Sequence, residues 1–335
     1  MNIANTIQSL YEQYGQLKGV TIECQKELVA IGIKNKSATA EVFLQGAQIT
    51  RYQRTGELPA LFLSKACRYQ EGSALRGGMP ISWPWFSDLA KNPKSVKQQL
   101  ISDDHEVTAT EFPAHGFVRN RQWNLESITT PTDDQTILEL SYHVKKESLW
   151  PFETLLTYRI TIGETLSARL HITNKSPQAF VFSGALHSYF AVSHIDNVSV
   201  RGFDQCEYYD ALDADENGEW RVNTQQGDTT FTEEVDRVYQ SSNTPVTIVD
   251  NPRMNKNNGL THPKRVLRLQ SAGSKSTVVW NPWAEKSQAL TQFEKNDYLR
   301  MVCIETANAV SDTVRLEPNG EHALQLTLEV GGINV

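Results

Sequence analysis

The pattern of apolar residues changes its period early in the chain. Near the N-terminus, large apolar side chains recur at intervals of three and four residues, which places them along one stripe of a helix. These residues are Ile7, Leu10, Tyr11, Tyr14 and Leu17. The spacing predicts one short amphipathic helix, a helical N-terminal extension within residues 1–18.

Beyond this extension, apolar and polar residues alternate, which is the period of a pleated strand. Residues 156–162 and 166–172 alternate on either side of Gly163-Glu164-Thr165, a pattern typical of a hairpin. The same alternation runs through residues 138–144 and 324–330. Because no long helical pattern lies between the strands, the chain is expected to be all-β, a large antiparallel sandwich and not a doubly wound parallel sheet.

Two polar, glycine-bearing stretches, residues 213–227 and 252–263, interrupt the alternation. We interpret them as surface loops and not as linkers, because the strand pattern resumes after each of them. A chain of 335 residues is long enough to bury one large core. We therefore expect a single domain over residues 1–335.

Charge and cysteine content narrow the choice of partners. The formal net charge of −7 argues against a broad nucleic-acid-binding surface, although it is compatible with a local basic pocket. The four cysteines are far apart and form no Cys-x-x-Cys pair, which fits a reduced setting. Neither a signal peptide nor an apolar run of about 18 residues is visible. We expect a cytoplasmic monomer that binds neither nucleic acid nor a membrane.

The segment from Arg76 to Phe86 has a composition suited to ligand binding. Arg76-Gly77-Gly78 is followed by two tryptophans and two prolines. Glycine lets the backbone approach a ligand closely, and aromatic faces suit the C–H face of a sugar. A tight turn that leads into a hydrophobic cluster explains the segment about equally well.

A second segment, residues 114–123, brings one histidine and two arginines together. In an extended strand, His115, Phe117 and Arg119 would share a face. Arg121 would lie on that face too, so at least one of these charges is expected to reach solvent. Taken alone, His115 is more simply interpreted as a structural histidine.

Two further residues stand out because of their apolar surroundings. His187 lies among small and apolar residues, where burial lowers the pKa of a histidine and a nearby carboxylate raises it. Glu305 ends the apolar run 301–304, and glutamate is rarely fully buried unless it is paired or functional. Glu305 is therefore the strongest single anomaly in the sequence, whereas a hydrogen-bonded core residue remains the alternative for His187.

In this order, the segments resemble the aldose 1-epimerase, or galactose mutarotase-like, superfamily, and most closely its glucose-6-phosphate 1-epimerase branch. The resemblance covers most of the chain. It rests on Gly46-Ala47-Gln48-Ile49, Arg-Gly-Gly-x-Pro at 76–80, His-Gly-x-x-Arg-Asn at 115–120, Leu186-His187-Ser188-Tyr189-Phe190, residues 234–239, Trp280-Asn281-Pro282-Trp283 and Cys303-Ile304-Glu305.

The resemblance implies a β-supersandwich, in which two large antiparallel sheets carry the site on one of them. It implies that His187 is the general acid that protonates the ring oxygen of a sugar. Glu305 is implied to be the general base that takes the proton from the C1 hydroxyl. His115 and Asp236 match positions that hold sugar hydroxyls.

The chemistry of anomerisation agrees with these residue types. Opening a hemiacetal requires one proton to leave O1 while another arrives at the ring oxygen, so one acid and one base on opposite sides suffice. No hydride moves, no Walker-type glycine loop is visible, and the histidines show no His-Glu-x-x-His spacing. We expect neither a cofactor nor a metal.

A phosphate group on the substrate separates this branch from enzymes of free sugars. Arg76 and Arg119 match phosphate-contacting arginines of the branch, and a guanidinium can hold phosphate oxygens in a bidentate fork. Lys286, at the end of the tryptophan and proline cluster 280–287, is a third candidate. Solvated surface charge is the simpler explanation for all three, and for Lys286 it is the favoured one.

We therefore expect an isomerase that interconverts the anomers of a hexose 6-phosphate, with the sugar phosphate as its small-molecule partner. The nearest alternative is a mutarotase for unphosphorylated aldoses, which would not need the two arginines. A glycosidase with Glu305 and Asp236 as paired carboxylates is a different class, but its mechanism gives His187 no required role. A carbohydrate-binding sandwich without catalytic activity is the last alternative.

Overall fold

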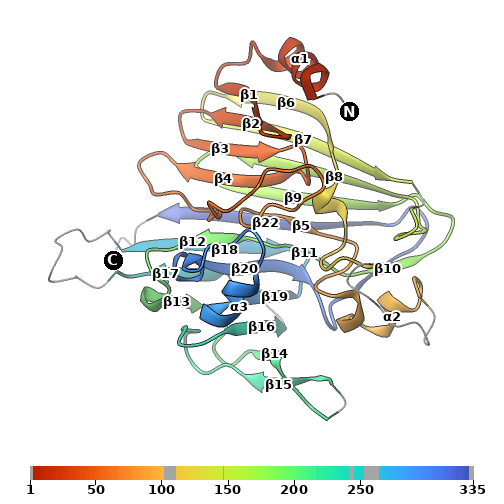
Figure 1. The fold of residues 1–335 in the computed structure, drawn as a ribbon, viewed down its shortest axis with the longest axis vertical. Coiled ribbons are helices and arrows are strands. Elements are labelled where there is room, and N and C mark those ends of the chain that lie inside the picture. The colour runs from red at the N-terminus through yellow and green to blue at the C-terminus, as the bar shows by residue number, and fades with distance from the viewer. Residues whose placement is uncertain are drawn as a thin grey trace.

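Antiparallel strands make up most of the part of the chain that the computed structural model describes. That part comprises residues 3–101, 111–145, 147–216, 218–240, 245–252 and 264–331. The strands form two eight-stranded sheets, one four-stranded sheet and one two-stranded sheet (Figure 1). Every pairing between named strands is antiparallel, so the predicted all-β antiparallel class is confirmed.

One eight-stranded sheet, called here the site sheet, has the strand order β15-β14-β16-β19-β20-β11-β5, with β12 also paired to β20. Its strands are β5 (Ile81–Ser82), β11 (Gly184–Leu186), β12 (Tyr189–Ala191), β14 (Glu207–Ala214), β15 (Trp220–Thr224), β16 (Val235–Gln240), β19 (Ser276–Asn281) and β20 (Met301–Asn308). The hairpin of β14 and β15 lies at the end of the molecule opposite to the N-terminal helix (Figure 1).

The other eight-stranded sheet, called here the back sheet, has the order β13-β17-β18-β22-β9-β8-β7-β6. Its strands are β6 (Asn124–Thr132), β7 (Gln135–Val144), β8 (Thr154–Ile162), β9 (Thr165–Asn174), β13 (Val198–Arg201), β17 (Val246–Asp250), β18 (Arg265–Ala272) and β22 (Glu321–Gly331). β8 and β9 form the hairpin predicted from the alternation on either side of Gly163-Glu164-Thr165. The strands predicted within residues 138–144 and 324–330 are β7 and β22.

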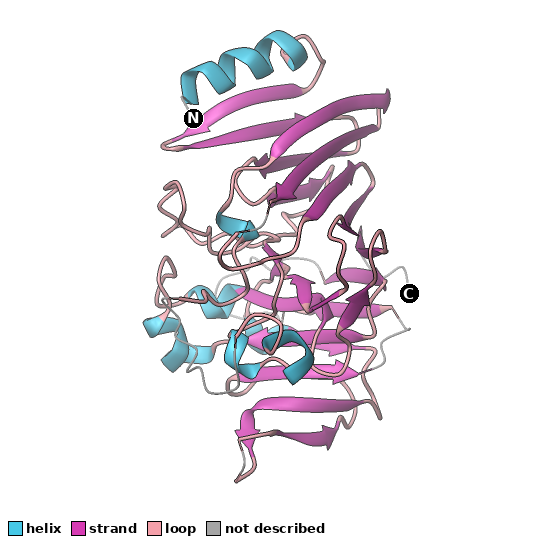
Figure 2. Cartoon of the chain, turned by 90° about the vertical axis from the view of Figure 1, so that its right-hand side faces the viewer, coloured by secondary structure: helices cyan, strands magenta, loops and turns pink. Residues whose placement is uncertain are grey.

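The smaller sheets and the helices flank these two. The four-stranded sheet consists of β1 (Val20–Gln25), β2 (Leu28–Lys34), β3 (Ala38–Phe43) and β4 (Gln48–Arg54), and the two-stranded sheet of β10 (Phe180–Phe182) and β21 (Val314–Leu316). The α-helices are α1 (Ile3–Tyr14), α2 (Lys94–Lys97) and α3 (Trp283–Ala289), and the 3-10 helices are η1 (Leu89–Lys91), η2 (Val118–Asn120), η3 (Ile195–Asn197) and η4 (Asp297–Arg300). The short helical segments in the lower half of the molecule lie to one side of its strands (Figure 2).

The predicted N-terminal helix is α1, but it ends at Tyr14, so Leu17 lies beyond it. Its one fully buried side chain is Leu10, which joins the main core. In the described part of the chain, none of the helices combines the length and the hydrophobicity needed to span a bilayer.

Strand β20 shows how the site sheet divides two apolar clusters. Val302 and Ile304 point into the large core shared with the back sheet. Met301 and Cys303 point to the opposite face and belong to a separate cluster. Because successive side chains of a strand face opposite ways, Glu305 lies on this second face together with Cys303. The site sheet is therefore buried on both faces, which matches the uniformly buried pattern of β20.

The two stretches expected to be surface loops have different outcomes. Residues 213–227 are not a loop throughout, because β15 lies within them and pairs with β14. The polar residues there are compatible with a strand because β15 is at the edge of the sheet and largely exposed. The other stretch, residues 252–263, lies almost entirely outside the described residues.

Candidate active site

His187 and Glu305 lie side by side where two short strands pair with β20: His187 follows β11 and precedes β12, and Glu305 lies on β20. The pairs Leu186↔Thr306 and Tyr189↔Cys303 lie on either side of them in one continuous register. Directly opposite residues of an antiparallel pair have neighbouring side chains. The imidazole Nδ1 and the carboxyl Oε1 are accordingly 3.4 Å apart. Sequence-distant residues are thus brought into contact by strand pairing alone.

This contact differs from the expected placement of acid and base on opposite sides of a sugar ring. A separation of 3.4 Å leaves no room for a pyranose between His187 and Glu305. Both groups must therefore approach a sugar from one edge. O1 and the ring oxygen are bonded to the same carbon, so two adjacent groups at one edge can serve both oxygens.

The next row of side chains on this face runs across four strands. The register places Tyr189 beside Cys303, Cys303 beside Trp280, and Trp280 beside Asp236. The Tyr189 ring stacks on the His187 ring, with centroids 4.8 Å apart and planes 5° apart, and Trp280 stands edge-on to both. The imidazole of His187 therefore has one aromatic neighbour parallel to its plane and a second perpendicular to it.

The glycine pair predicted to allow close backbone approach does so, but toward the protein itself. Gly77 and Gly78 have φ angles of 123° and 65°. A Cβ atom at either position would lie within 2.4 Å of a carbonyl oxygen, that of Phe62 or Ile49. Only glycine fits both the dihedral angles and the space. The pair packs the segment that carries Arg76 tightly against its neighbours.

The same segment is hydrogen-bonded to the stretch of chain that carries His187 and Tyr189. The amide of His187 donates to the carbonyl of Pro80 at 2.9 Å, and the amide of Tyr189 donates to that of Gly78 at 2.8 Å. Arg76 lies two residues before Gly78 and donates from Nε to the carbonyl of Thr291 at 3.3 Å. The guanidinium of Arg76 and the imidazole of His187 thus belong to one hydrogen-bonded framework.

The segment around His115 is a turn and not the extended strand considered from the sequence. His115 and Gly116 both have φ above 60°, and residues 118–120 form the 3-10 helix η2. A Cβ atom at Gly116 would lie 1.9 Å from the carbonyl oxygen of Trp83, so the backbone turns where only glycine fits. Arg121, the charge expected to reach solvent, is half-exposed and pairs with Glu147 at 3.0 Å.

The turn fixes the tautomer of His115. The amide of Ser87 donates to Nδ1 at 3.3 Å, so Nδ1 carries no proton and Nε2 is the donor of the neutral ring. Burial and the charge of Arg119 hold the pKa of His115 well below its usual value, which keeps the ring neutral. The ring lies 5.1 Å from that of His187, centroid to centroid. His115 is thereby a neutral donor beside the acid–base pair.

Arg76 and Arg119 lie close enough for the charge of one to lower the pKa of the other, and neither forms an ion pair with a carboxylate in the described structure. Among the residues that the structure describes, neither guanidinium has an acidic oxygen within the 4.0 Å of an ion pair. Burial and the charge of Arg76 lower the pKa of Arg119 to about 10. Nη2 of Arg119 donates to the carbonyl of Ala114 at 2.7 Å, but its buried Nε has no hydrogen-bond partner in the described structure. Two neighbouring guanidinium groups without an ion-pair partner are suited to bind an anion.

The electrostatic surroundings favour neutral forms of both members of the acid–base pair. Burial, followed by the charges of Arg119 and Arg76, lowers the pKa of His187 to about 3. Burial and the charge of Asp236 raise the pKa of Glu305 well above its usual value. His187 Nδ1 and Glu305 Oε2 lack hydrogen-bond partners within the described part of the chain. Unsatisfied buried atoms cost roughly 1–3 kcal/mol each, so the fold maintains this pair at the expense of stability.

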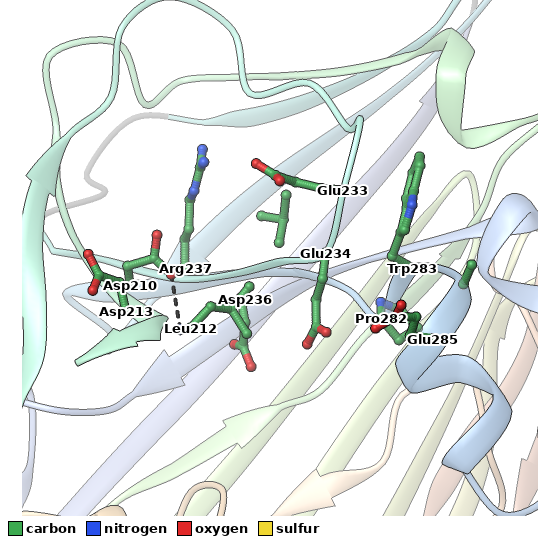
Figure 3. Close-up of a pocket in the computed structure, with 12 residues that line it drawn as sticks. Asp210, Leu212, Asp213, Glu233, Glu234, Asp236, Arg237, Pro282, Trp283 and Glu285 are labelled. Carbon is green, nitrogen blue, oxygen red and sulfur yellow. Dashed lines mark hydrogen bonds between the residues drawn. The ribbon is translucent and has the colours of Figure 1, made fainter. Parts of the chain in front are cut away.

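Asp236 lines a hollow of about 520 Å³, and Lys286 lies beside this carboxylate. Nζ of Lys286 is 2.6 Å from Glu234 and 3.8 Å from Asp236. The carboxylates of Glu234 and Asp236 point the same way, whereas Arg237 points to the other side (Figure 3). The structure therefore places Lys286 with carboxylates, and its predicted phosphate contact stays a prediction. Burial raises the pKa of Asp236 to about 6, although Lys286 opposes the shift.

The side chains of His187 and Glu305 are less exposed to solvent than the polar side chains around them. Side-chain exposure is 7% for His187 and 2% for Glu305. Polar side chains around the pair are only partly buried, namely Arg76, His115, Arg119 and Asp236. Wherever the structure describes the chain, no group of three or more His, Cys, Asp and Glu residues could hold a metal ion.

Two site residues were not singled out from the sequence, Tyr189 and Cys303. Cys303 lies two residues from Glu305 on β20, and Tyr189, the first residue of β12, lies two residues from His187, which follows β11. The two-residue period of a strand would have placed each on the face of its neighbour. Ser87 left no comparable signal, because it reaches His115 only through the turn.

An antiparallel sandwich that carries an adjacent imidazole and carboxyl on one sheet is the arrangement of a sugar mutarotase, an isomerase that interconverts anomers. The comparison with protein families agrees. The profile described as aldose 1-epimerase matches residues 29–329, and the chain belongs to this family. The protein is an epimerase, as predicted.

Individual relatives support the same assignment. A Cenchrus ciliaris protein with the provisional name glucose-6-phosphate 1-epimerase is 29% identical over 307 residues, which cover 88% of this chain and 82% of the relative. An Escherichia coli K12 protein with the same provisional name is 29% identical and is matched over 84% of each chain. A solved structure from Salmonella typhimurium, provisionally described as a mutarotase, superposes with a TM-score of 0.77 at 26% identity and covers 95% of this chain and 96% of that one.

Proposed function

We propose that this epimerase acts on a hexose 6-phosphate, with glucose 6-phosphate as the first substrate to test. The observation that carries the proposal is the pair of neighbouring guanidinium groups, Arg76 and Arg119, which form no ion pair with an acidic residue in the described structure. A free sugar offers nothing to neutralise them. A phosphate dianion does, and it accepts hydrogen bonds from both. The provisional names of the plant and bacterial relatives point the same way.

His187 and Glu305 are proposed to move the protons. Glu305, as base, takes the proton from O1 while His187, as acid, gives a proton to the ring oxygen. The bond between C1 and the ring oxygen breaks, and O1 becomes the oxygen of an aldehyde. Rotation about the C1–C2 bond presents the other face of the aldehyde, and ring closure with the two roles exchanged yields the other anomer. The proton count is unchanged over the cycle.

The resting charge state is compatible with this scheme because the two groups share one mobile proton. In the empty site burial favours a protonated Glu305 beside a neutral His187. Part of the shift at His187 comes from Arg119 and Arg76. A bound phosphate neutralises these charges and thereby raises the pKa of His187, while it also removes the effect by which Arg119 lowers the pKa of Glu305. The scheme requires the proton of Glu305 to pass to His187 before Glu305 acts as the base.

His115 and Asp236 are proposed to orient the sugar. The neutral His115 ring offers Nε2–H to a sugar oxygen. Asp236 offers carboxylate oxygens, and Lys286 limits the rise of its pKa. His115 can therefore donate to one sugar oxygen, and Asp236 can accept from a sugar hydroxyl.

The proposal is tested by following the optical rotation, or NMR exchange between anomers, of freshly dissolved α-glucose 6-phosphate and α-glucose with one enzyme preparation. The expected result is a kcat/KM for the phosphorylated sugar at least about tenfold higher, the effect of charge-assisted hydrogen bonds to one phosphate. Equal values for the two sugars would contradict the assignment and favour a mutarotase for free aldoses.

A further inference from the structure

Tyr189 lies between the two parts of the site that the proposed function needs. Its ring stacks on His187 at 4.8 Å and 5°. Its hydroxyl makes a side-chain interaction with the guanidinium of Arg76. No other described side chain has both an aromatic stack on His187 and an interaction with Arg76.

The backbone holds Tyr189 firmly in this position. Its amide donates to Gly78, its carbonyl accepts from the amide of Phe62, and its register partner on β20 is Cys303. Trp280 stands edge-on to the rings of both Tyr189 and His187, at 6.1 and 6.0 Å. The phenol ring is therefore fixed on two sides, and a fixed ring restricts the rotation of the imidazole that stacks on it.

We propose that Tyr189 is a positioning residue with two separable tasks: its ring holds His187 in the orientation for proton transfer, and its hydroxyl holds Arg76 in the orientation for phosphate binding. The second task rests on the proposed function, whereas the first applies to any sugar that the epimerase turns over. Neither task gives Tyr189 contact with the reacting atoms.

The two tasks can be separated by two substitutions. Tyr189→Phe keeps the ring and removes the hydroxyl, so we expect KM for glucose 6-phosphate to rise about threefold to tenfold while kcat stays within twofold. KM for free glucose should not change. Tyr189→Leu removes the flat ring, so kcat should fall about tenfold or more on both sugars, because a misplaced acid transfers its proton poorly.

Tyr142→Phe is the matched control. It removes a hydroxyl that donates to Glu147 at 2.9 Å on the back sheet, and we expect no change in either constant. Far-ultraviolet circular dichroism and the unfolding midpoint are measured for each variant. If Tyr189→Leu does not fold, the Tyr189→Phe result alone decides the hydroxyl task, and Tyr189→Met, which also removes the flat ring, replaces it for the stacking task.

The proposal is overturned if Tyr189→Phe lowers kcat as much as Tyr189→Leu does, or if neither variant differs from the control. Failure of the proposed function looks different. In that case the native protein shows no preference for the phosphorylated sugar, and the loss of kcat on free glucose in Tyr189→Leu still measures the stacking task.

Discussion

The two large sheets each carry a cross-strand pair of an acid and a base, and the pairs differ in every other respect. On the back sheet, Glu139 of β7 faces Arg159 of β8 and forms an ion pair. About half of each side chain is exposed to solvent, 46% and 51% respectively. On the site sheet, Glu305 faces His187, and both are almost completely buried.

The two pairs differ in whether solvent and hydrogen-bond partners compensate for their polar atoms. The exposed ion pair is solvated and has opposite charges in contact, an arrangement that contributes at most about 1 kcal/mol to stability. The buried pair has polar atoms without partners in the described structure, and it lies within the field of two arginines that lack acidic partners. Strand pairing can place an acid beside a base anywhere in a sheet. Only burial and uncompensated neighbours make the pair chemically useful.

The largest effect is expected from removing either member of the buried pair. Glu305→Gln or His187→Ala should lower the rate of anomerisation by about 10²-fold or more, the usual scale for a lost general acid or base. Steady-state polarimetry measures the rate, and a binding assay with the sugar phosphate should show a smaller change. A loss of less than about fivefold in both variants would remove the pair from the chemistry.

The next largest effect concerns the arginines that surround the buried pair. Arg76→Ala or Arg119→Ala should raise KM for glucose 6-phosphate about tenfold or more, because each removes hydrogen bonds to a charged group. KM for free glucose should change little. Parallel kinetics on the two sugars decide the matter, and equal losses on both would refute a phosphate-binding role.

The free energy of unfolding should change with pH in opposite directions when one or the other member of the buried pair is replaced. Burial lowers the pKa of His187 to about 3, so below the usual histidine pKa the unfolded chain binds more protons, and stability falls as the pH falls. Burial raises the pKa of Glu305, so above the usual glutamate pKa the folded chain binds more protons, and stability falls as the pH rises. The two contributions oppose each other between about pH 4.5 and 6.5 in the native protein.

A variant that lacks one of the two titrating groups should show only the pH dependence that comes from the other group. Relative to the native protein, the free energy of unfolding of His187→Gln should decrease with rising pH, and that of Glu305→Gln should increase, by up to about 1.4 kcal/mol per pH unit. Urea unfolding at about pH 5 and 6 measures both slopes. Parallel curves for all three proteins would show that burial does not shift these two groups.

The smallest effect is expected on the back sheet. Glu139→Gln should lower the free energy of unfolding by about 1 kcal/mol or less and leave anomerisation unchanged. The same unfolding and polarimetry experiments measure both quantities. A loss of activity in this variant would remove the distinction between the two pairs.

The strands could be predicted because their side chains alternate, and the hairpin of β8 and β9 is the clearest case. Glu305 could also be singled out, because a carboxyl within an apolar strand is anomalous wherever the strand lies. The resemblance to a family supplied the partner, since periodicity alone could not tell that His187 and Glu305 share a register.

The remaining differences between the predicted and the observed site come from packing between residues that are far apart in the sequence. The backbone at His115 turns because Gly116 lies against the carbonyl of Trp83, which no local pattern indicates. Lys286 forms an ion pair with Glu234, which is far from it in the sequence. The stack of Tyr189 on His187 is local in sequence, and the two-residue period would have placed both rings on one face but could not show that they stack.

The most direct test of the central claim measures the exchange of α- and β-glucose 6-phosphate at equilibrium by NMR magnetisation transfer, with the native protein and with Glu305→Gln at equal concentration. The account predicts that the native protein accelerates the exchange far above the spontaneous rate and that the variant loses about 10²-fold of this acceleration while it remains folded. A folded Glu305→Gln protein that exchanges the anomers at the native rate would contradict the claim that this buried carboxyl moves the proton.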